Sequence, residues 1–356
     1  MGFLKIVKGQ DRAEALLGNS FARDRLAHAY LFAGPSGVGR LSTALELAAS
    51  WMCRREKDGY CGECRDCRRI FEFQHPDVRF TIPMTGQTAP EDIAALFDAR
   101  VRDGVTPLRL EGNTRISIDQ IRELEERLSR KAFEDRGHIE VLLDADRMGS
   151  EAANALLKTL EEPPDDTVII LVSSRWSALL PTVRSRSHLV RFRRIGLELL
   201  TRILQDRLEL EPEEARRLAM ASDGRPGLGL LAGEEKSNDA DEFGPRAVLS
   251  KLRECESAFG ALSLASKVST KLRSEGSIEL SRSMQAFLHD LRRHGCGLVP
   301  LTRPASELEG FRLTPEDCSG AMEAFRAAEN RLIMNVQARI ALGAAFCNVW
   351  SRILKR

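Results

Sequence analysis

Four of the eight cysteines in this 356-residue chain lie in one short stretch, which is the strongest candidate for metal chemistry. They are Cys53, Cys61, Cys64 and Cys67. Thiolates separated by two residues can turn back onto one ion, and four of them complete a tetrahedral zinc site without an open position for water. The spacing therefore predicts a structural Zn²⁺ ion rather than a catalytic one. The alternatives are an iron–sulfur cluster and a set of four buried or redox-active thiols.

A glycine-rich loop is the second candidate for chemistry. Residues 34–41 place Gly34, Gly37 and Gly39 as in loops that cradle phosphates between a strand and a helix. Active loops of this type have a phosphate-binding Lys and a Ser or Thr that holds Mg²⁺, but here Arg40 and Leu41 occupy these positions. The segment thus has the form of a phosphate site without its two reactive side chains. Taken alone, an ordinary glycine-rich turn explains the segment equally well, but its position between a predicted strand and a predicted helix favours a phosphate loop.

An acidic residue after a later apolar run fits the same kind of site. Asp144 follows Val-Leu-Leu, where an ATPase of this type has its Mg²⁺ ligand. Ala145 follows it, where an active enzyme has a Glu that activates water. Taken alone, such an Asp is more often a cap or turn residue. The two segments together predict a nucleotide-binding ancestry with lost catalytic groups, which puts ATP binding in doubt.

Short apolar runs and helical patterns alternate in the first half of the chain and must position these residues. The apolar runs lie at 29–33, 78–82, 139–143 and 168–172, with a weaker one at 189–192. Helical patterns lie at 41–51, 117–130 and 150–160. Strands separated by helices pair in parallel, so we expect an α/β sheet covered by helices on both faces. Residues 81–115, rich in Pro and Gly, are interpreted as an insertion or long loop.

The second half of the chain has helical patterns only. Those at 194–208 and 211–221 predict a small helical domain at 194–232, and an acidic linker at 233–245 precedes a further helical domain at 246–356. This last domain ends in apolar residues at helical spacing, namely Ile333, Val336, Ile340, Ala344, Cys347 and Trp350. We expect this stripe to bind neighbouring chains, although filling the domain's own core explains it nearly as well.

The composition is that of an ordinary globular protein. With 53 Lys and Arg against 52 Asp and Glu, the net charge is +1, which excludes a global basic field for nucleic-acid binding. The longest strongly apolar run, at 168–172, is far shorter than the roughly 20 residues that span a bilayer. The first residues lack a signal-peptide pattern. We expect a cytoplasmic protein without a membrane segment.

The order of these motifs resembles the delta-prime subunits of bacterial DNA polymerase III clamp loaders, which belong to the AAA+ family. The matching segments lie at 28–32, 75–78, 118–122, 144–148, 152–164 and 180–187. The resemblance implies an AAA+ P-loop domain at 1–193, with a parallel five-stranded sheet, a zinc module at 53–67 and an insertion at 81–115. It further implies that 194–232 is a lid domain and that 246–356 is an all-α oligomerisation (collar) domain.

The resemblance implies a subunit without independent catalysis, within a DNA-directed DNA polymerase (nucleotidyltransferase) holoenzyme. Such a stator sits in a hetero-pentameric ring with motor gamma/tau and clamp-opening delta subunits, which loads the sliding clamp onto primed DNA during replication. The family's Ser-Arg-Cys motif carries an arginine finger that acts in trans on ATP of a neighbouring motor. Ser185, Arg186 and Ser187 match it. Gly227 stands where active members have a second phosphate-binding Arg.

Two alternative functions remain open from the sequence. An active ATPase motor of the same loader would retain the Lys, the hydroxyl and the Glu that are missing here. A zinc-dependent DNA-binding protein would read DNA with the cysteine stretch, but residues 53–69 carry only six Arg or Lys against four Asp or Glu. This weak excess gives little support to direct DNA contact.

Overall fold

The computed structural model describes residues 3–104, 106–108, 110, 112–235, 243–301, 305–311, 313–334 and 336–353. It divides into two compact units. The first comprises Met1–Glu209 and Ser222–Leu231, and the second comprises Leu210–Ala221 and Ala232–Arg356. Residues 236–242 of the predicted linker lie outside the described part of the chain.

The first unit contains a five-stranded parallel sheet with the order β2-β3-β4-β1-β5. The strands are β1 (Ala29–Ala33), β2 (Val78–Thr81), β3 (His138–Leu142), β4 (Thr167–Ser173) and β5 (His188–Arg191). Each predicted apolar run forms one strand, so the predicted parallel α/β sheet is confirmed. The weakly apolar run forms β5, an edge strand of the sheet. An edge strand has a neighbouring strand on one side only, so it needs fewer apolar side chains than a central strand.

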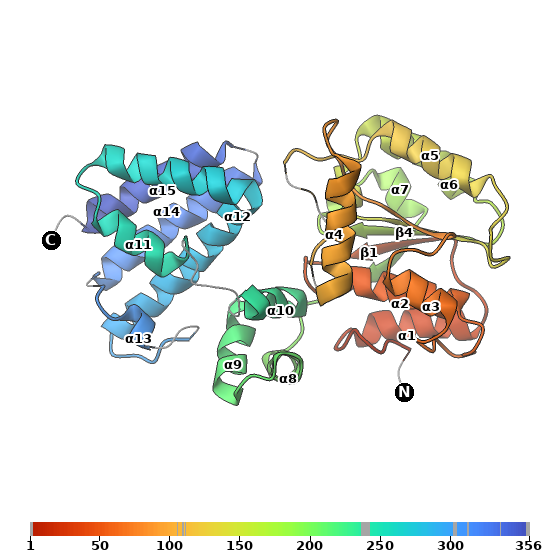
Figure 1. Ribbon diagram of the computed structural model, residues 1–356, viewed down its shortest axis with the longest axis horizontal. Coiled ribbons are helices and arrows are strands. Elements are labelled where there is room, and N and C mark those ends of the chain that lie inside the picture. Colours follow the sequence, from red (N-terminus) through yellow and green to blue (C-terminus); the bar gives the residue numbers. More distant parts are fainter. Residues whose placement is uncertain are drawn as a thin grey trace. The chain divides into compact units, whose positions relative to one another are not determined.

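Helices cover both faces of this sheet, as Figure 1 shows. One layer contains α1 (Asp11–Ala22), α2 (Arg40–Met52) and α3 (Arg65–Phe71), and the other contains α5 (Ile118–Leu128), α6 (Ser150–Glu161) and α7 (Pro181–Ser185). Alternate side chains of β1 point to opposite layers: Tyr30 and Phe32 lie in the first core, and Leu31 lies in the second. Short 3₁₀ turns at Ala145–Arg147 and Trp176–Ala178 follow β3 and β4.

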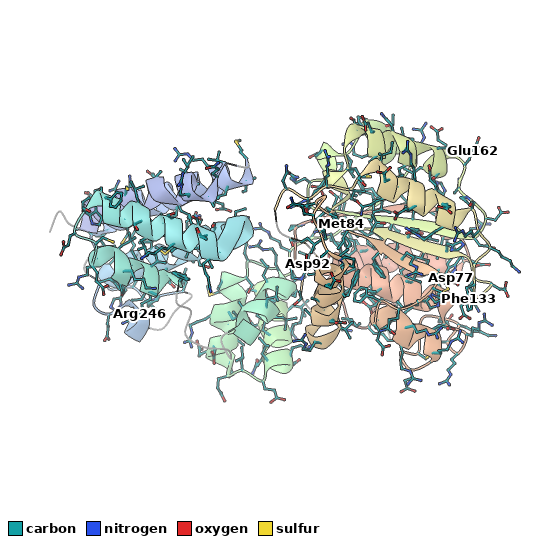
Figure 2. The ribbon with its side chains drawn as sticks, turned by 45° about the horizontal axis from the view of Figure 1, so that its top comes forward. Asp77, Met84, Asp92, Phe133, Glu162 and Arg246 are labelled. Carbon is teal, nitrogen blue, oxygen red and sulfur yellow. The ribbon has the colours of Figure 1, made fainter. Side chains whose placement is uncertain are left out.

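The interpretation of 81–115 as a long loop is wrong in part, because this insertion contains helix α4 (Pro90–Asp103). Its Pro and Gly residues delimit the helix: Pro90 begins it and Gly104, with a φ of 70°, ends it. The carboxylate of Asp92 accepts the N–H of Ala89 in the first turn. Met84 and Arg115 exchange backbone hydrogen bonds of 3.0 Å, which close the base of the insertion. Figure 2 labels Met84 and Asp92 in this region.

Three helices follow the sheet: α8 (Leu197–Leu208), α9 (Pro212–Ala221) and α10 (Pro226–Glu235). The division into compact units places α8 and the first turns of α10 with the sheet and α9 with the second unit. The lid at 194–232, the linker at 233–245 and the collar at 246–356 stay predictions.

The second unit is helical where it is described. Besides α9 it contains α11 (Pro245–Arg253), α12 (Ala258–Gly295), α13 (Ala305–Leu308), α14 (Pro315–Ile333) and α15 (Ala338–Ile353). Phe287, Phe325 and Phe346 lie at its core. The predicted apolar stripe starts on exposed residues, with Ile333 46%, Val336 36% and Ile340 55% exposed.

Among the described residues, none of the helices combines the length and the apolar character that crossing a membrane requires.

Candidate metal centre and phosphate loop

Helix α2 carries one candidate site at each end. The glycine-rich loop precedes Arg40, its first residue, and Cys53 caps its carboxyl end. Ten of its thirteen residues are buried, so the helix is a rigid spacer between the two sites.

The four sulfurs of the cysteine stretch come together. All four Sγ atoms lie within 4.8 Å of one another, and those of Cys61 and Cys67 are 3.9 Å apart. Four sulfurs at ~2.3 Å from one tetrahedral ion lie about 3.8 Å from each other, so the cluster fits a zinc-sized ion. Cys53, Cys64 and Cys67 are buried and Cys61 is half-buried. The four cysteines could therefore hold one metal ion in a shell made only of sulfur.

Backbone N–H groups of this stretch point at the sulfurs. Cys61 N–H donates to Cys53 Sγ at 3.4 Å, and Cys64 N–H donates to Cys61 Sγ at 3.3 Å. Burial by itself raises the pKa of the Cys61 thiol, but the N–H donors of Glu63 and Cys64 outweigh it and lower this pKa to about 6. Burial raises the pKa of Cys67. N–H donors stabilise the thiolate, the form in which cysteine binds metal.

A buried carboxylate in the middle of α2 supports the cysteine stretch. Glu46 is 0% exposed, and it accepts the N–H groups of Lys5, Ile6 and Val7 and the hydroxyl of Tyr60. Burial and the adjacent Glu46 charge raise the pKa of Tyr60, which keeps its hydroxyl protonated as the donor. Tyr60 directly precedes the second cysteine. Glu46 thereby ties the amino-terminal segment and the cysteine stretch to one helix.

The loop between α5 and β3 holds the other side of the cysteine stretch. Asp77, which is 3% exposed, accepts the N–H groups of Phe133 and Glu134 at 2.7 Å each. Figure 2 shows Asp77 and Phe133 next to one another. Arg54 donates to the carbonyl of Glu134 at 2.7 Å, and Arg65 pairs with its carboxylate. The cysteine stretch is therefore held by Glu46 on one side and by Glu134 on the other, which is typical of a structural element.

The phosphate loop has the backbone shape that its glycines permit. Gly37 and Gly39 have φ angles of 81° and 97°, in the left-handed region. A Cβ atom at Gly34 would lie 2.5 Å from the carbonyl oxygen of Phe192, and one at Gly39 would lie 2.9 Å from Val7. The fold thus requires glycine at all three positions, whatever the loop binds.

The first turn of α10 packs directly on this loop. The N–H of Gly227 donates to the carbonyl of Gly37 at 2.8 Å, and a Cβ at Gly37 would lie 3.2 Å from Leu228. Arg40 is only 7% exposed. Gln10 donates to the carbonyls of Val38 and Arg193 at 3.3 and 2.7 Å, and so joins the loop to the end of the sheet. The loop is therefore a packed structural element.

Asp144 lies at the same edge of the sheet as the phosphate loop. The carboxyl ends of β3 and β1 are separated only by β4, which places them about 10 Å apart. Asp144 has a φ of 46°, and its Oδ2 is 3.9 Å from Nε of Arg147. Arg147 also bonds the hydroxyl of Thr114 from the insertion. Ala145 is fully buried.

The insertion brings an arginine to the amino end of α2. Arg100 of α4 is 9% exposed, and its guanidinium donates to Ser42 Oγ at 3.0 Å and to the carbonyl of Thr106 at 3.4 Å. Ser42 lies in the first turn of α2, directly after the loop. The insertion is thereby anchored next to the phosphate loop.

Arg186 lies in the turn between α7 and the edge strand β5, and its side chain is 36% exposed. Its Nη1 donates to the carbonyl of Thr182 at 3.2 Å, and its Nη2 is 2.5 Å from Oε1 of Glu161. Neighbouring Arg184 instead lies with its guanidinium 5.5 Å from the ring centre of Trp176.

Comparison with known proteins identifies the class of this chain. Residues 9–196 match the family described as "DNA polymerase III, delta subunit", and the chain belongs to this family. It is 35% identical over 213 residues to DNA polymerase III subunit delta' of Bacillus subtilis (strain 168), covering 59% of this chain and 55% of that protein. The corresponding subunit of Pseudomonas aeruginosa is 34% identical over 216 residues, covering 59% of this chain and 57% of the relative. The predicted resemblance to delta-prime subunits is confirmed.

A gamma/tau subunit is also similar to this chain. DNA polymerase III subunit gamma/tau of Mycobacterium tuberculosis (strain ATCC 25618 / H37Rv) is 31% identical over 189 residues, which cover 52% of this chain and 28% of that protein. The chain spans about half the length of the delta' relatives that it matches.

The structure brings some of the predicted residues together and adds others. The four cysteines form one cluster, and Gly34, Gly37, Gly39, Arg40 and Asp144 share one edge of the sheet. Sequence patterns missed Glu46, Arg100 and Glu161. Glu46 stands between Leu45 and Leu47, and a charged residue inside such an apolar helical segment was the available signal.

Proposed function

We propose that this chain is a clamp-loader subunit of a bacterial DNA polymerase III holoenzyme, acting as its stator during replication. Membership of the DNA polymerase III delta-subunit family is the observation that carries this proposal. Its partners would be gamma/tau motor subunits and a clamp-opening delta subunit in a five-membered ring. The sliding clamp and primed DNA would be reached through that complex, with no membrane involved.

Within this AAA+ assembly, the chain itself would not hydrolyse ATP. Arg40 and Leu41 replace the Lys and the hydroxyl that bind phosphate and Mg²⁺, and Ala145 cannot activate water. The packing of α10 on the loop, through Gly227 and Gly37, supports a structural rather than a nucleotide-binding loop. These residues argue against the alternative of an active motor.

Arg186 would supply the catalytic contribution of the chain, as an arginine finger in trans. A guanidinium is always charged, and its planar donors suit the oxygens of a transferring γ-phosphoryl group. The edge position of β5 supports this role, because a turn beside an edge strand can face a neighbouring subunit. Its partial exposure leaves the side chain within reach of such a neighbour.

A zinc ion in the four-cysteine cluster would stabilise the first unit. Cys53, Cys61, Cys64 and Cys67 would hold it through their thiolates, and a bound ion would supply folding energy rather than chemistry. Direct DNA reading by this stretch receives little support, because Arg54 and Arg65 are engaged by Glu134.

The second unit would be the collar that joins this chain to its neighbours. Its exposed apolar residues support this role: Ile333, Met334, Val336 and Ile340 are 46%, 80%, 36% and 55% exposed where α14 ends and α15 begins. Exposed apolar side chains grouped in this way are typical of interaction surfaces.

The proposed function is tested in the reconstituted complex with clamp and primed DNA. Arg186→Ala is expected to lower ATP hydrolysis while the subunits still assemble. In small GTPases, an arginine supplied in trans raises the turnover at its own site by a factor of ~10³–10⁵. The loss in total turnover is smaller, because other ATP sites in the ring continue. Arg184→Ala is the control, as Arg184 packs on Trp176 of its own chain. Unchanged hydrolysis and clamp loading with Arg186→Ala would reduce Arg186 to a surface charge.

A further inference from the structure

Arg186 is held by a carboxylate of its own chain. Glu161, the last residue of α6, places Oε1 2.5 Å from Nη2 of Arg186. The carbonyl of Thr182 accepts from Nη1 at 3.2 Å, so two acceptors fix the direction of the guanidinium. Both charged side chains remain partly exposed, Arg186 by 36% and Glu161 by 49%.

The position of Glu161 in its helix is unfavourable unless a cation neutralises it. The carboxyl end of a helix carries partial negative charge, and acidic side chains are destabilising there. Helix α6 nevertheless ends in Glu161, and Glu162 follows as its cap. The pairing with Arg186 compensates Glu161 and gives a local reason for an acid at this place.

We propose that Glu161 is a positioning residue that holds Arg186 against its own chain until the phosphates of a neighbour's nucleotide replace the carboxylate. This inference rests on the proposed function of Arg186 in trans. While Arg186 is paired with Glu161, its charge is neutralised and its donors are partly used. A triphosphate with several negative oxygens attracts the guanidinium more strongly than one carboxylate does.

The exchange is feasible because the ion pair is exposed to water. Partly exposed pairs of this kind contribute little to stability and are screened by salt. The pair is therefore strong enough to direct the side chain and weak enough to be replaced. Its consequence is low hydrolysis when the neighbouring site is not correctly assembled.

The first test measures the contact itself in the isolated full chain. Phenylglyoxal modifies arginines, and mass spectrometry reports the rate at Arg186 relative to other arginines of the same molecule. Glu161→Gln keeps the shape of the side chain and removes its charge. We expect this variant to raise the rate of phenylglyoxal modification at Arg186 about twofold to fivefold. This factor is the increase in the fraction of unpaired Arg186 when an exposed ion pair is lost.

Glu162→Gln is the matched control. Glu162 is exposed and lies next to Glu161 at the end of the same helix, where Figure 2 labels it. The control is expected to leave the rate at Arg186 unchanged. An equal rate in Glu161→Gln and wild type would overturn the proposal.

The second test measures ATP hydrolysis by the reconstituted complex before clamp and DNA are added. Glu161→Gln is expected to raise this basal rate by up to about fivefold and to lower the stimulation by clamp and DNA. In the double variant Glu161→Gln/Arg186→Ala the rate should equal that of Arg186→Ala alone. A reduced rate with Glu161→Gln, or an increase that persists without Arg186, contradicts the proposal.

The two tests separate failure of this inference from failure of the proposed function. If Arg186→Ala leaves hydrolysis unchanged, the finger role fails, and the positioning role fails with it even where the modification rates show the contact. If Arg186→Ala lowers hydrolysis and Glu161→Gln changes neither measurement, the finger role stands and only the positioning role of Glu161 is overturned.

Discussion

At the amino end of α2 the chain builds its phosphate loop from backbone groups, whereas at the carboxyl end four cysteine side chains build the candidate metal centre. Both lie in the same unit and are joined by thirteen residues of one buried helix. The loop has glycines at its three tight positions but lacks the side chains that act on phosphate. The cysteine cluster has all four of its ligand atoms within 4.8 Å of one another.

This difference shows which parts of a site the fold itself depends on. The loop glycines remain necessary because Phe192, Val7 and α10 pack against them, so the loop shape survives without phosphate chemistry. Lys and Ser or Thr side chains have no such packing role, and their replacement by Arg40 and Leu41 leaves the fold intact. A four-thiolate site has no spare ligand, so its chemistry and its structure would be lost together.

The largest effect is expected from Cys67→Ser, which removes one sulfur from the cluster. Bound zinc should fall from about one ion per four-cysteine site to well below half, because three thiolates hold the ion poorly. Residues 53–69 should become sensitive to protease. Elemental analysis and limited proteolysis measure both changes, with Cys347→Ser in the second unit as control. Wild-type protein purified without chelator and containing no metal would show that the cluster is a set of free thiols.

The next largest effect is expected from Glu46→Gln, in the middle of α2. The variant places an NH₂ group against donors and loses charge-assisted hydrogen bonds, which should lower the free energy of unfolding by about 2–4 kcal/mol. Denaturant unfolding measures the change. Glu14→Gln is the control, because half-buried Glu14 accepts the N–H of Leu4 from the same amino-terminal segment. Equal losses of unfolding free energy in the two variants would argue against Glu46 as the residue that ties the amino-terminal segment and the cysteine stretch to α2.

A smaller effect is expected from Arg100→Met, which detaches the insertion from the amino end of α2. The loss of the bonds to Ser42 and Thr106 should cost about 1–2 kcal/mol, while the apolar part of the side chain is kept. Hydrogen exchange should increase in α4 and the first turn of α2, but remain unchanged at the cysteine stretch. Arg102 is exposed on the same helix, so Arg102→Met should change neither the free energy of unfolding nor the hydrogen exchange. Loosening at the cysteines instead would mean that the two ends of α2 are not independent.

The smallest effect is expected from restoring the lost side chains. The triple variant Arg40→Lys/Leu41→Thr/Ala145→Glu should hydrolyse ATP no faster than the wild-type chain, because α10 packs on the loop and Ala145 is fully buried. Phosphate release measures turnover. A gain of more than about 100-fold, the usual contribution of a catalytic group, that Asp144→Asn abolishes would show that only the side chains had been lost.

The sequence predicted those features that depend on local patterns. Each of the five apolar runs became a strand, and their separation by helices was sufficient to predict parallel pairing. The cysteine spacing predicted a common site because two-residue gaps bring thiolates together whatever the surrounding fold. The resemblance to delta-prime subunits rested on ordered motifs over half the chain, and the family match confirms it.

Features that depend on contacts between distant segments were missed. The sequence of 81–115 is rich in Pro and Gly, which predicted a loop. In the structure Pro90 and Gly104 delimit a helix that is held by packing: the ring centres of its Phe97 and of Phe73 are 4.9 Å apart. The apolar stripe from Ile333 to Trp350 fitted a core or a surface equally well. Its first members proved to be exposed: Ile333 ends α14, Val336 lies between the two helices, and Ile340 lies on α15, where Leu342 and Phe346 are buried instead.

The sequence by itself determined the strands, the cysteine cluster and the missing phosphate-binding side chains, because residue type and spacing along the chain decide these. Only the tertiary structure decided that one helix carries both candidate sites, that Glu46 ties residues 5–7 and Tyr60 to it, and that Glu161 holds Arg186. A hydrogen bond or ion pair between residues far apart leaves no periodic trace in the sequence. It forms only after hydrophobic burial has brought the segments together.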